Sequence, residues 1–219
     1  NMAFKLMGAA MKISDDPVIK QEWDEILFDL EERTGYSRKR IKQSAGIEDQ
    51  QLRGILPIHP YAASLLKHIS ASFASNQRSM FDFIKNSGNE DLKGFQWYID
   101  NFGPFSENPF LTVDLLWGFF YDNGKNDLSQ NIRQILDRYA NLAKQLDDEE
   151  QKVLKTILLF QAMSESASDQ IDIFLPNENN LNLAFEGTDF ESGQAVKCAE
   201  KLVREKVIYK KTLKDGSFL

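Results

Sequence analysis

Hydrophobic residues recur at every third or fourth position along most of the chain, which is the period of an amphipathic helix. In the first clear case Ile19, Trp23 and Leu30 share one helical face, Pro17 supplies a start signal and Gly35 a stop signal. The same pattern predicts helices over residues 37–46, 61–74, 80–85, 89–101, 113–122, 129–146, 147–163, 176–185 and 192–205. The fold class is therefore predicted to be mainly α.

The pattern changes near the C-terminus. Residues 207–211 (Val-Ile-Tyr-Lys-Lys) are typical of a strand, residues 214–216 of a hairpin turn, and residues 217–219 of a return strand. Three helices followed by a small β-hairpin are the element order of a winged helix. We expect three parts: N-terminal helices or a linker over residues 1–55, a helical lid-like bundle over residues 56–146, and a winged-helix domain over residues 147–219.

Composition narrows the class of protein. The chain has 219 residues, of which 42% are hydrophobic, and a net charge of −7. We expect a soluble cytoplasmic protein without a membrane partner, because no apolar run approaches the length of a membrane span. A single cysteine, Cys198, and two histidines leave no disulfide framework and no material for a metal site. The first residue, Asn1, and the ending inside the expected hairpin suggest a piece of a longer protein.

Basic residues are concentrated in two places. Residues 33–53 hold six basic and two acidic side chains, which indicates either a solvated helix face or a contact with nucleic acid or an acidic partner. The last predicted helix and the hairpin hold the second group. In winged helices the third helix can enter the DNA major groove while the wing touches the backbone. The DNA-binding candidates are therefore Lys197, Lys201, Arg204, Lys210, Lys211 and Lys214.

The DNA hypothesis has an open alternative. Beyond Gln194 and Arg204, the last helix lacks side chains suited to reading base edges. Many winged helices instead pack against, or bind, other proteins. The sequence leaves both interpretations standing.

Catalytic motifs are missing. Gly118 and Gly124-Lys125-Asn126 come near a phosphate-binding loop, but the spacing is one residue too long and Asn replaces the required hydroxyl residue. Cys198 is predicted to be a buried core thiol, and the acids at 147–150 a helix start. His59, at a helix entry before Pro60, is predicted to bond a loop backbone. Arg78 either caps helix carbonyls or reaches a phosphate or carboxylate across a domain boundary.

Two neighbouring segments carry a family resemblance. The first reads Leu-Pro-Ile-His-Pro-Tyr-Ala-Ala-Ser-Leu-Leu over residues 56–66, and the second reads Phe-Ala-Ser-Asn-Gln-Arg-Ser-Met-Phe-Asp-Phe over residues 73–83. Together they resemble a stretch of large bacterial P-loop (AAA+-like) ATPases, most of all the ATPase of BREX-type phage-defence systems and its relatives. In that family the segment follows the ATPase core, and helical and winged-helix modules come after it. The resemblance covers residues 50–219.

This resemblance implies a function for the chain. It would be a non-catalytic helical lid and winged helix that couple nucleotide state to the binding of double-stranded DNA or of other subunits of a defence complex. ATP and Mg²⁺ would belong to the parent ATPase, with no cofactor in this chain, and Arg78 would be a nucleotide-sensing candidate. The alternative is an interaction scaffold without DNA or nucleotide contact. A free-standing transcription regulator is the weakest of the three hypotheses, because the chain lacks a clear reading helix and a dimerisation helix.

Overall fold

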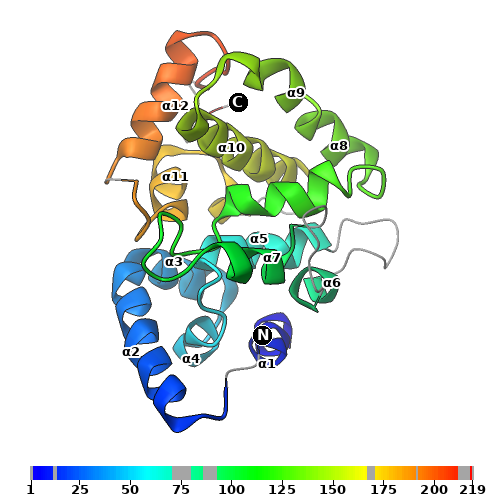
Figure 1. The fold of residues 1–219 in the computed structure, drawn as a ribbon. Coiled ribbons are helices and arrows are strands. Elements are labelled where there is room, and N and C mark those ends of the chain that lie inside the picture. The colour runs from blue at the N-terminus through cyan, green and yellow to red at the C-terminus, as the bar shows by residue number, and fades with distance from the viewer. Residues whose placement is uncertain are drawn as a thin grey trace.

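The structure is a computed structural model that describes residues 2–11, 14–70, 80–85, 93–166, 171–190, 192–211 and 218. Within these residues the chain is mainly helical, as the periodicity predicted (Figure 1). Strand pairing in the same residues is limited to two isolated bridges, Ile58 with Leu111 and Lys210 with Phe218. None of the described helices is long and apolar enough to cross a membrane.

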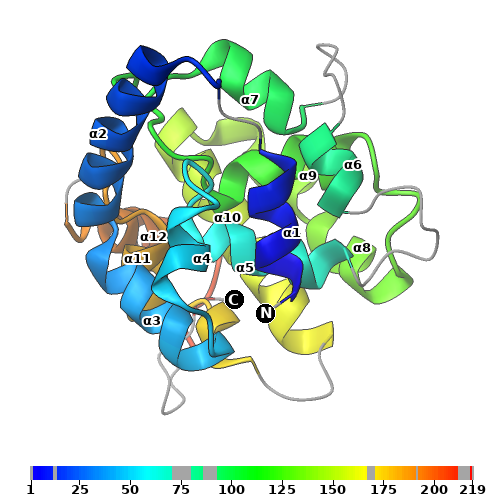
Figure 2. The same cartoon turned by 90° about the horizontal axis from the view of Figure 1, so that it is seen from below.

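The helices form two tiers with α5 between them (Figure 1). The lower tier consists of α1 (Met2–Ala10), α2 (Pro17–Arg33), α3 (Gly35–Ala45) and α4 (Asp49–Arg53). The middle holds α5 (Pro60–Ser70), α6 (Met80–Lys85) and α7 (Phe95–Asn101). The upper tier holds α8 (Gln130–Leu136), α9 (Tyr139–Leu142), α10 (Asp148–Ser166), α11 (Glu178–Ala184) and α12 (Gln194–Arg204). Seen from below, α1 lies over the centre of the molecule and α2 along its outer edge (Figure 2).

Helix α10 is the centre of the upper tier. Asp147 and Glu150 begin it with reciprocal bonds, since the Asp147 N–H donates to Glu150 Oε2 at 3.0 Å and the Glu150 N–H donates to Asp147 Oδ1 at 2.9 Å. The helix then packs against α5, α8, α11 and α12. The core around it runs without a break from Phe4 to Phe218. This core crosses both expected boundaries, after residues 55 and 146, and the three-part division stays a prediction.

The three helices predicted for the C-terminal part of the chain are present in the structure. Helices α10, α11 and α12 follow one another as expected, and Ala195, Cys198, Ala199 and Leu202 form the buried face of α12. The thiol of Cys198 lies inside this face, and burial raises its pKa to about 12. Of the expected hairpin, the described residues contain the antiparallel bridge between Lys210 and Phe218.

Three local predictions were wrong. Gly35 does not act as the stop signal of the first helix but begins α3, and Ser37 is buried inside α3, where its hydroxyl donates to the Thr34 carbonyl. The predicted helix 113–122 is instead a 3₁₀ turn at residues 113–115 and a π-helical turn at residues 118–122.

The predicted helix 129–146 divides into α8, α9 and a final 3₁₀ turn. The break falls at Asp137, whose carboxylate accepts the Tyr121 hydroxyl, and just before Tyr139, whose hydroxyl donates to Gln151 of α10 at 2.8 Å. These two bonds hold the chain against neighbouring elements on either side of the break, so tertiary contacts override a continuous helical period here.

Candidate functional site

His59 lies at the centre of the motif that carries the family resemblance. Its ring is fully buried, with Nε2 3.2 Å from the Glu186 carbonyl oxygen, and the Tyr61 N–H donates to Nδ1 at 3.3 Å. These two bonds place the proton on Nε2. Burial lowers the pKa of His59 to about 3, so the ring stays neutral at physiological pH. Both nitrogens are occupied, which makes His59 a structural residue that joins the entry of α5 to the loop after α11.

Glu186 is the residue on which this junction depends, and sequence reasoning did not identify it. Its carboxylate accepts the backbone N–H groups of Tyr36 at 3.0 Å and Ser37 at 2.6 Å, and so caps the start of α3. The next residue, Gly187, has a φ of +78°, and a Cβ there would lie 2.7 Å from the Arg33 carbonyl oxygen. The loop after α11 is therefore pressed against the junction of α2 and α3.

A buried polar bond extends the junction to α11. The Tyr61 hydroxyl donates to Asn180 Oδ1 at 3.0 Å, and the Asn180 amide donates to the carbonyls of Asp172 at 2.7 Å and Leu175 at 2.8 Å. Tyr61 of the motif 56–66 is thereby connected to α11 and, through Asn180, to the carbonyl groups of the segment before α11. The motif therefore helps to hold the two tiers together.

The predicted DNA face is partly occupied by ion pairs. Lys201 Nζ lies 2.5 Å from the buried Glu150 carboxylate and 3.6 Å from Asp147. Lys210 Nζ lies 2.5 Å from Glu178 of α11 and 3.7 Å from Glu200 of α12. The hydrogen bonds to Glu150 and Glu178 raise the pKa values of the two lysines. Two of the six DNA-binding candidates thus connect elements of the protein to one another.

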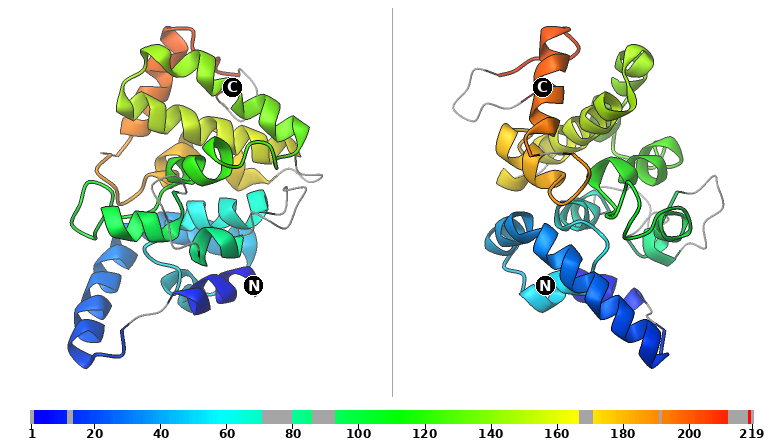
Figure 3. Two further views of the ribbon diagram at one scale, coloured as in Figure 1. Left: turned by 45° about the vertical axis from the view of Figure 1, so that its right-hand side comes forward. Right: turned by 60° about the vertical axis from the view of Figure 1, so that its left-hand side comes forward.

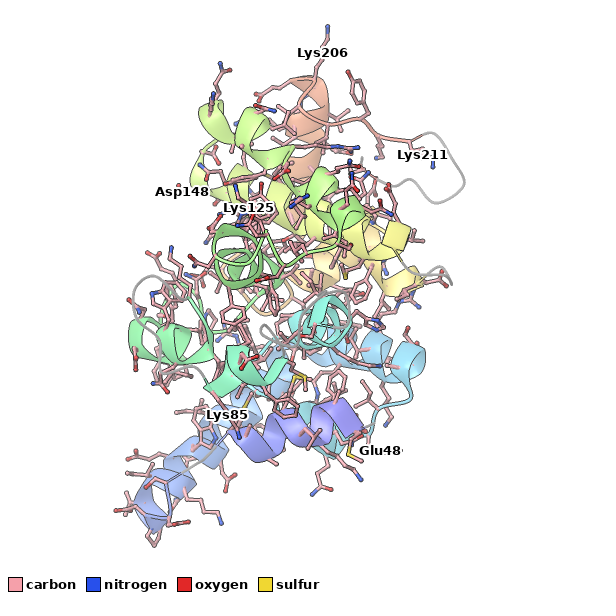
Figure 4. All side chains as sticks on the ribbon, turned by 90° about the vertical axis from the view of Figure 1, so that its right-hand side faces the viewer. Glu48, Lys85, Lys125, Asp148, Lys206 and Lys211 are labelled. Carbon is pink, nitrogen blue, oxygen red and sulfur yellow. The ribbon has the colours of Figure 1, made fainter. Side chains whose placement is uncertain are left out.

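The other DNA-binding candidates divide into two groups. Lys197, Arg204 and Lys211 are exposed, and within the described part of the chain none of them has an ion-pair partner. Lys211 lies at the α12 end of the molecule, where the neighbouring Lys206 also projects outward (Figure 4). Lys214 and the nucleotide-sensing candidate Arg78 both lie outside the described residues.

The first basic region, residues 33–53, is also largely paired. Arg38 and Arg53 both contact the Glu31 carboxylate of α2, and Arg53 lies 3.4 Å from Asp24 as well. Lys42 lies 2.5 Å from Asp49. These pairs fix α2, α3 and α4 to one another, so they leave few cations free for nucleic acid.

A polar pocket of about 550 Å³ lies between the start of α10, the turn at residues 112–115 and the loop at residues 185–190. On its wall the buried Asp114 accepts the Thr112 hydroxyl at 2.6 Å, and burial raises the pKa of this carboxyl. Lys155 lies over the Tyr139 ring at 5.2 Å, and burial lowers its pKa. The wall therefore combines acids and lysines that partly neutralise one another.

Two kinds of site are relevant among the described residues, a metal site and a phosphate-binding loop. Among the described residues no cluster of three His, Cys, Asp or Glu side chains could hold a metal ion. Gly118, which resembled part of a phosphate-binding loop, is buried at the start of the π-helical turn, and a Cβ there would lie 3.0 Å from the Lys93 side chain. The backbone of Gly118 is therefore covered by the Lys93 side chain and does not form an open phosphate-binding loop.

Helix α2 carries a surface that the sequence pattern misplaced. Its periodicity predicted an apolar face formed by Ile19, Trp23, Ile26, Leu27 and Leu30. In α2, which is wholly described, Leu27 and Leu30 are the buried positions. Ile19 is 48% exposed, and Val18 and Phe28 are 65% and 62% exposed. The helix therefore presents large apolar side chains to solvent.

Comparison with protein families, characterised proteins and solved structures finds no match for this chain. The resemblance to phage-defence ATPases rests on residues 56–66 and 73–83 alone. What the chain does has to be argued from its surfaces.

Proposed function

We propose that this chain is a non-catalytic helical module of a bacterial ATP-binding protein of the phage-defence type, and that it acts by binding a protein partner. The partner would be another subunit of the defence complex. The family part of the proposal is supported by the two motif segments. ATP and Mg²⁺ would be bound by the parent protein, and Arg78 would sense the nucleotide from the motif's second segment.

The observation that carries the choice of a protein partner is the pairing of the basic side chains. Binding to DNA draws on cations that replace the counterions of the phosphates. Lys201 and Lys210 already have carboxylate partners on neighbouring helices, and so do Arg38, Arg53 and Lys42. A cation that stays with its carboxylate adds little net charge to a DNA contact, whereas protein binding does not depend on these cations.

We also propose that residues 147–219 form a winged helix that scaffolds the module. The order of α10, α11 and α12 and the bridge between Lys210 and Phe218 support this arrangement. In it, α12 takes the position of a reading helix, but its pairing with α10 makes it a packing element.

Duplex-DNA binding is the second candidate function. The exposed Lys197, Arg204 and Lys211 favour it, because Lys197 and Arg204 lie seven residues apart and therefore on one face of α12. Three cations would support a weak contact that disappears with salt.

The test is a titration of the full chain against a fluorescent duplex of about 20 base pairs, at about 50 mM and about 150 mM salt. We expect affinity weaker than about 100 μM at the higher salt, the weak end of non-specific binding. A dissociation constant below about 1 μM would overturn the proposal if the K197E/K211E variant no longer binds the duplex. The control K39E/K125E changes two exposed lysines away from α12, one on α3 and one in the turn after residue 122, and should retain any contact that is specific to α12.

A further inference from the structure

The first turns of α2 extend beyond the other helices (Figures 1, 3 and 4). The inner end of the helix is anchored, because Leu27 and Leu30 pack with Leu56 and Phe110 in a small separate core. Trp23 and Ile26 are partly covered by this core, and Ile19 lies beyond it. The apolar stripe of α2 thus continues past the body of the molecule without a partner among the described residues.

The exposed side chains are of the kind that proteins bury when they associate. Val18 and Ile19 are each about half exposed or more, and they lie beside the partly buried Trp23 at the outer end of α2. Phe28 is also exposed, but it lies nine positions after Ile19 and therefore on the opposite face of the helix. Single exposed apolar residues are ordinary on protein surfaces, whereas several on one element mark an interaction site. The spacing of Ile19, Trp23 and Ile26 is the i, i+4, i+7 pattern by which one helix packs on another.

Charge indicates what would pack there. The sequence of α2 contains six acidic and two basic residues. Glu31 and Asp24 are paired with arginines of α3 and α4, and Asp29 lies 3.5 Å from Arg33. Glu22, Glu25 and Glu32 have no ion pair within the described residues. Glu22 and Glu25 follow Val18 at i+4 and i+7, so unneutralised carboxylates flank one side of the uncovered apolar side chains, where they attract a basic partner and repel an acidic one.

We infer that the outer part of α2 is a docking surface for a basic amphipathic helix of a partner protein. The inference rests on the proposed function and specifies its partner. The partner's apolar residues would cover Val18, Ile19 and Trp23, and its lysines or arginines would lie against Glu22 and Glu25. A second copy of this chain does not supply such a helix. Its own basic helix is α3, and Arg38 and Lys42 of α3 already form ion pairs within the chain.

The experiment uses the full chain and a fluorescent peptide of about 18 residues, with leucines at i, i+3, i+4 and i+7 and lysines elsewhere. We expect micromolar binding by anisotropy that weakens with salt. V18S/I19S and E22K/E25K should each weaken it by about tenfold or more. The matched controls are F105S, at a residue 89% exposed on another loop, and E107K/E205K, which changes the net charge equally; both should bind within about twofold of the original chain.

Four results would overturn the inference. Equal binding by all variants would mean that the peptide does not contact the outer part of α2, and equal weakening by E22K/E25K and E107K/E205K would mean that it responds only to the net charge of the chain. Equal binding of the same peptide with glutamate in place of lysine would exclude a basic partner. A dimer in sedimentation that V18S/I19S dissociates would identify a second copy as the occupant. None of these results depends on the DNA titration, so tight DNA binding would refute the proposed function while leaving this surface to be judged by its own variants.

Discussion

Helices α2 and α12 use similar residue types in opposite ways. The shorter helix, α12, has four buried residues over eleven positions, and Lys201 on its outer side pairs with the start of α10. The longer helix, α2, buries two residues over seventeen positions and leaves Val18, Ile19 and Phe28 in solvent. The comparison teaches that Lys201 of α12 serves the fold, whereas α2 leaves apolar side chains uncovered.

This difference reverses the usual interpretation of sequence patterns. A basic C-terminal helix suggested nucleic-acid binding, and an amphipathic first helix suggested core. In the structure the basic residue Lys201 closes a junction inside the protein, because the Glu150 side chain it meets is only 4% exposed. Both patterns are present in the sequence. Whether a basic or apolar face is buried depends on contacts with residues that are distant in the sequence, such as Glu150 for Lys201.

The largest expected effect is a difference in the free energy of unfolding between a variant of α12 and a variant of α2. L202A removes a fully buried side chain from α12 and should lower the free energy of unfolding by about 3 kcal/mol. I19A on α2 should change it by less than about 0.5 kcal/mol, because that side chain is already half in water. Urea unfolding of both variants measures the contrast. Equal losses would mean that the outer turns of α2 are part of the core.

The second effect concerns the inner end of α2, where the loop after α11 meets Arg33. G187A should cost about 2 kcal/mol, since it adds a Cβ 2.7 Å from a backbone oxygen at a positive φ. The control G46A has a similar φ of +60° but meets nothing within 4 Å, so it should show about 1 kcal/mol of conformational cost alone. Equal costs at the two glycines would contradict a tight contact at Gly187.

The third effect is a pH dependence at the same junction. His59 has a folded-state pKa of about 3 against an ordinary value of 6.5, so between these values the unfolded chain binds the extra proton. Stability is therefore full above pH 6.5 and falls with decreasing pH by up to about 1.4 kcal/mol per pH unit. The raised pKa of Asp114 acts in the opposite direction, because the folded state holds its proton more tightly.

H59Q separates the two contributions to the pH dependence. The variant should be less stable at pH 7.5 and should lose the decline below pH 6.5 that His59 causes. Urea midpoints from pH 4.5 to 7.5, compared between the two proteins, give the difference directly. Parallel curves would show that His59 is not held neutral in the fold.

The smallest effect tests the role of the cations on α12. K201A leaves the Glu150 carboxylate buried without its cation, whereas K197A changes an exposed side chain without an ion-pair partner in the described part of the chain. We expect K201A to lower the urea midpoint measurably and K197A to leave it unchanged. If the two variants unfold at the same midpoint, Lys201 is as free for DNA as Lys197.

Local sequence signals predicted most of the helices but not their partners. The Asp147 and Glu150 pair was visible as a helix start, because the two residues lie three apart. The bond from Glu186 to the start of α3 was not visible, because it spans 149 residues and has no local signal. The exposure of Ile19 could not be predicted either, since the period of a helix fixes which side chains share a face and not whether another element covers that face.

The central contrast is tested most directly by thiol labelling. The native chain has one cysteine, Cys198 on α12, and I19C/C198A moves the only thiol to α2. A maleimide should label position 19 about 100 times faster than Cys198, whose burial raises its pKa to about 12. Saturating basic peptide should slow labelling at position 19 by about tenfold and leave Cys198 unchanged. An unchanged rate at position 19 with the peptide bound would contradict the account, because the partner would then lie elsewhere.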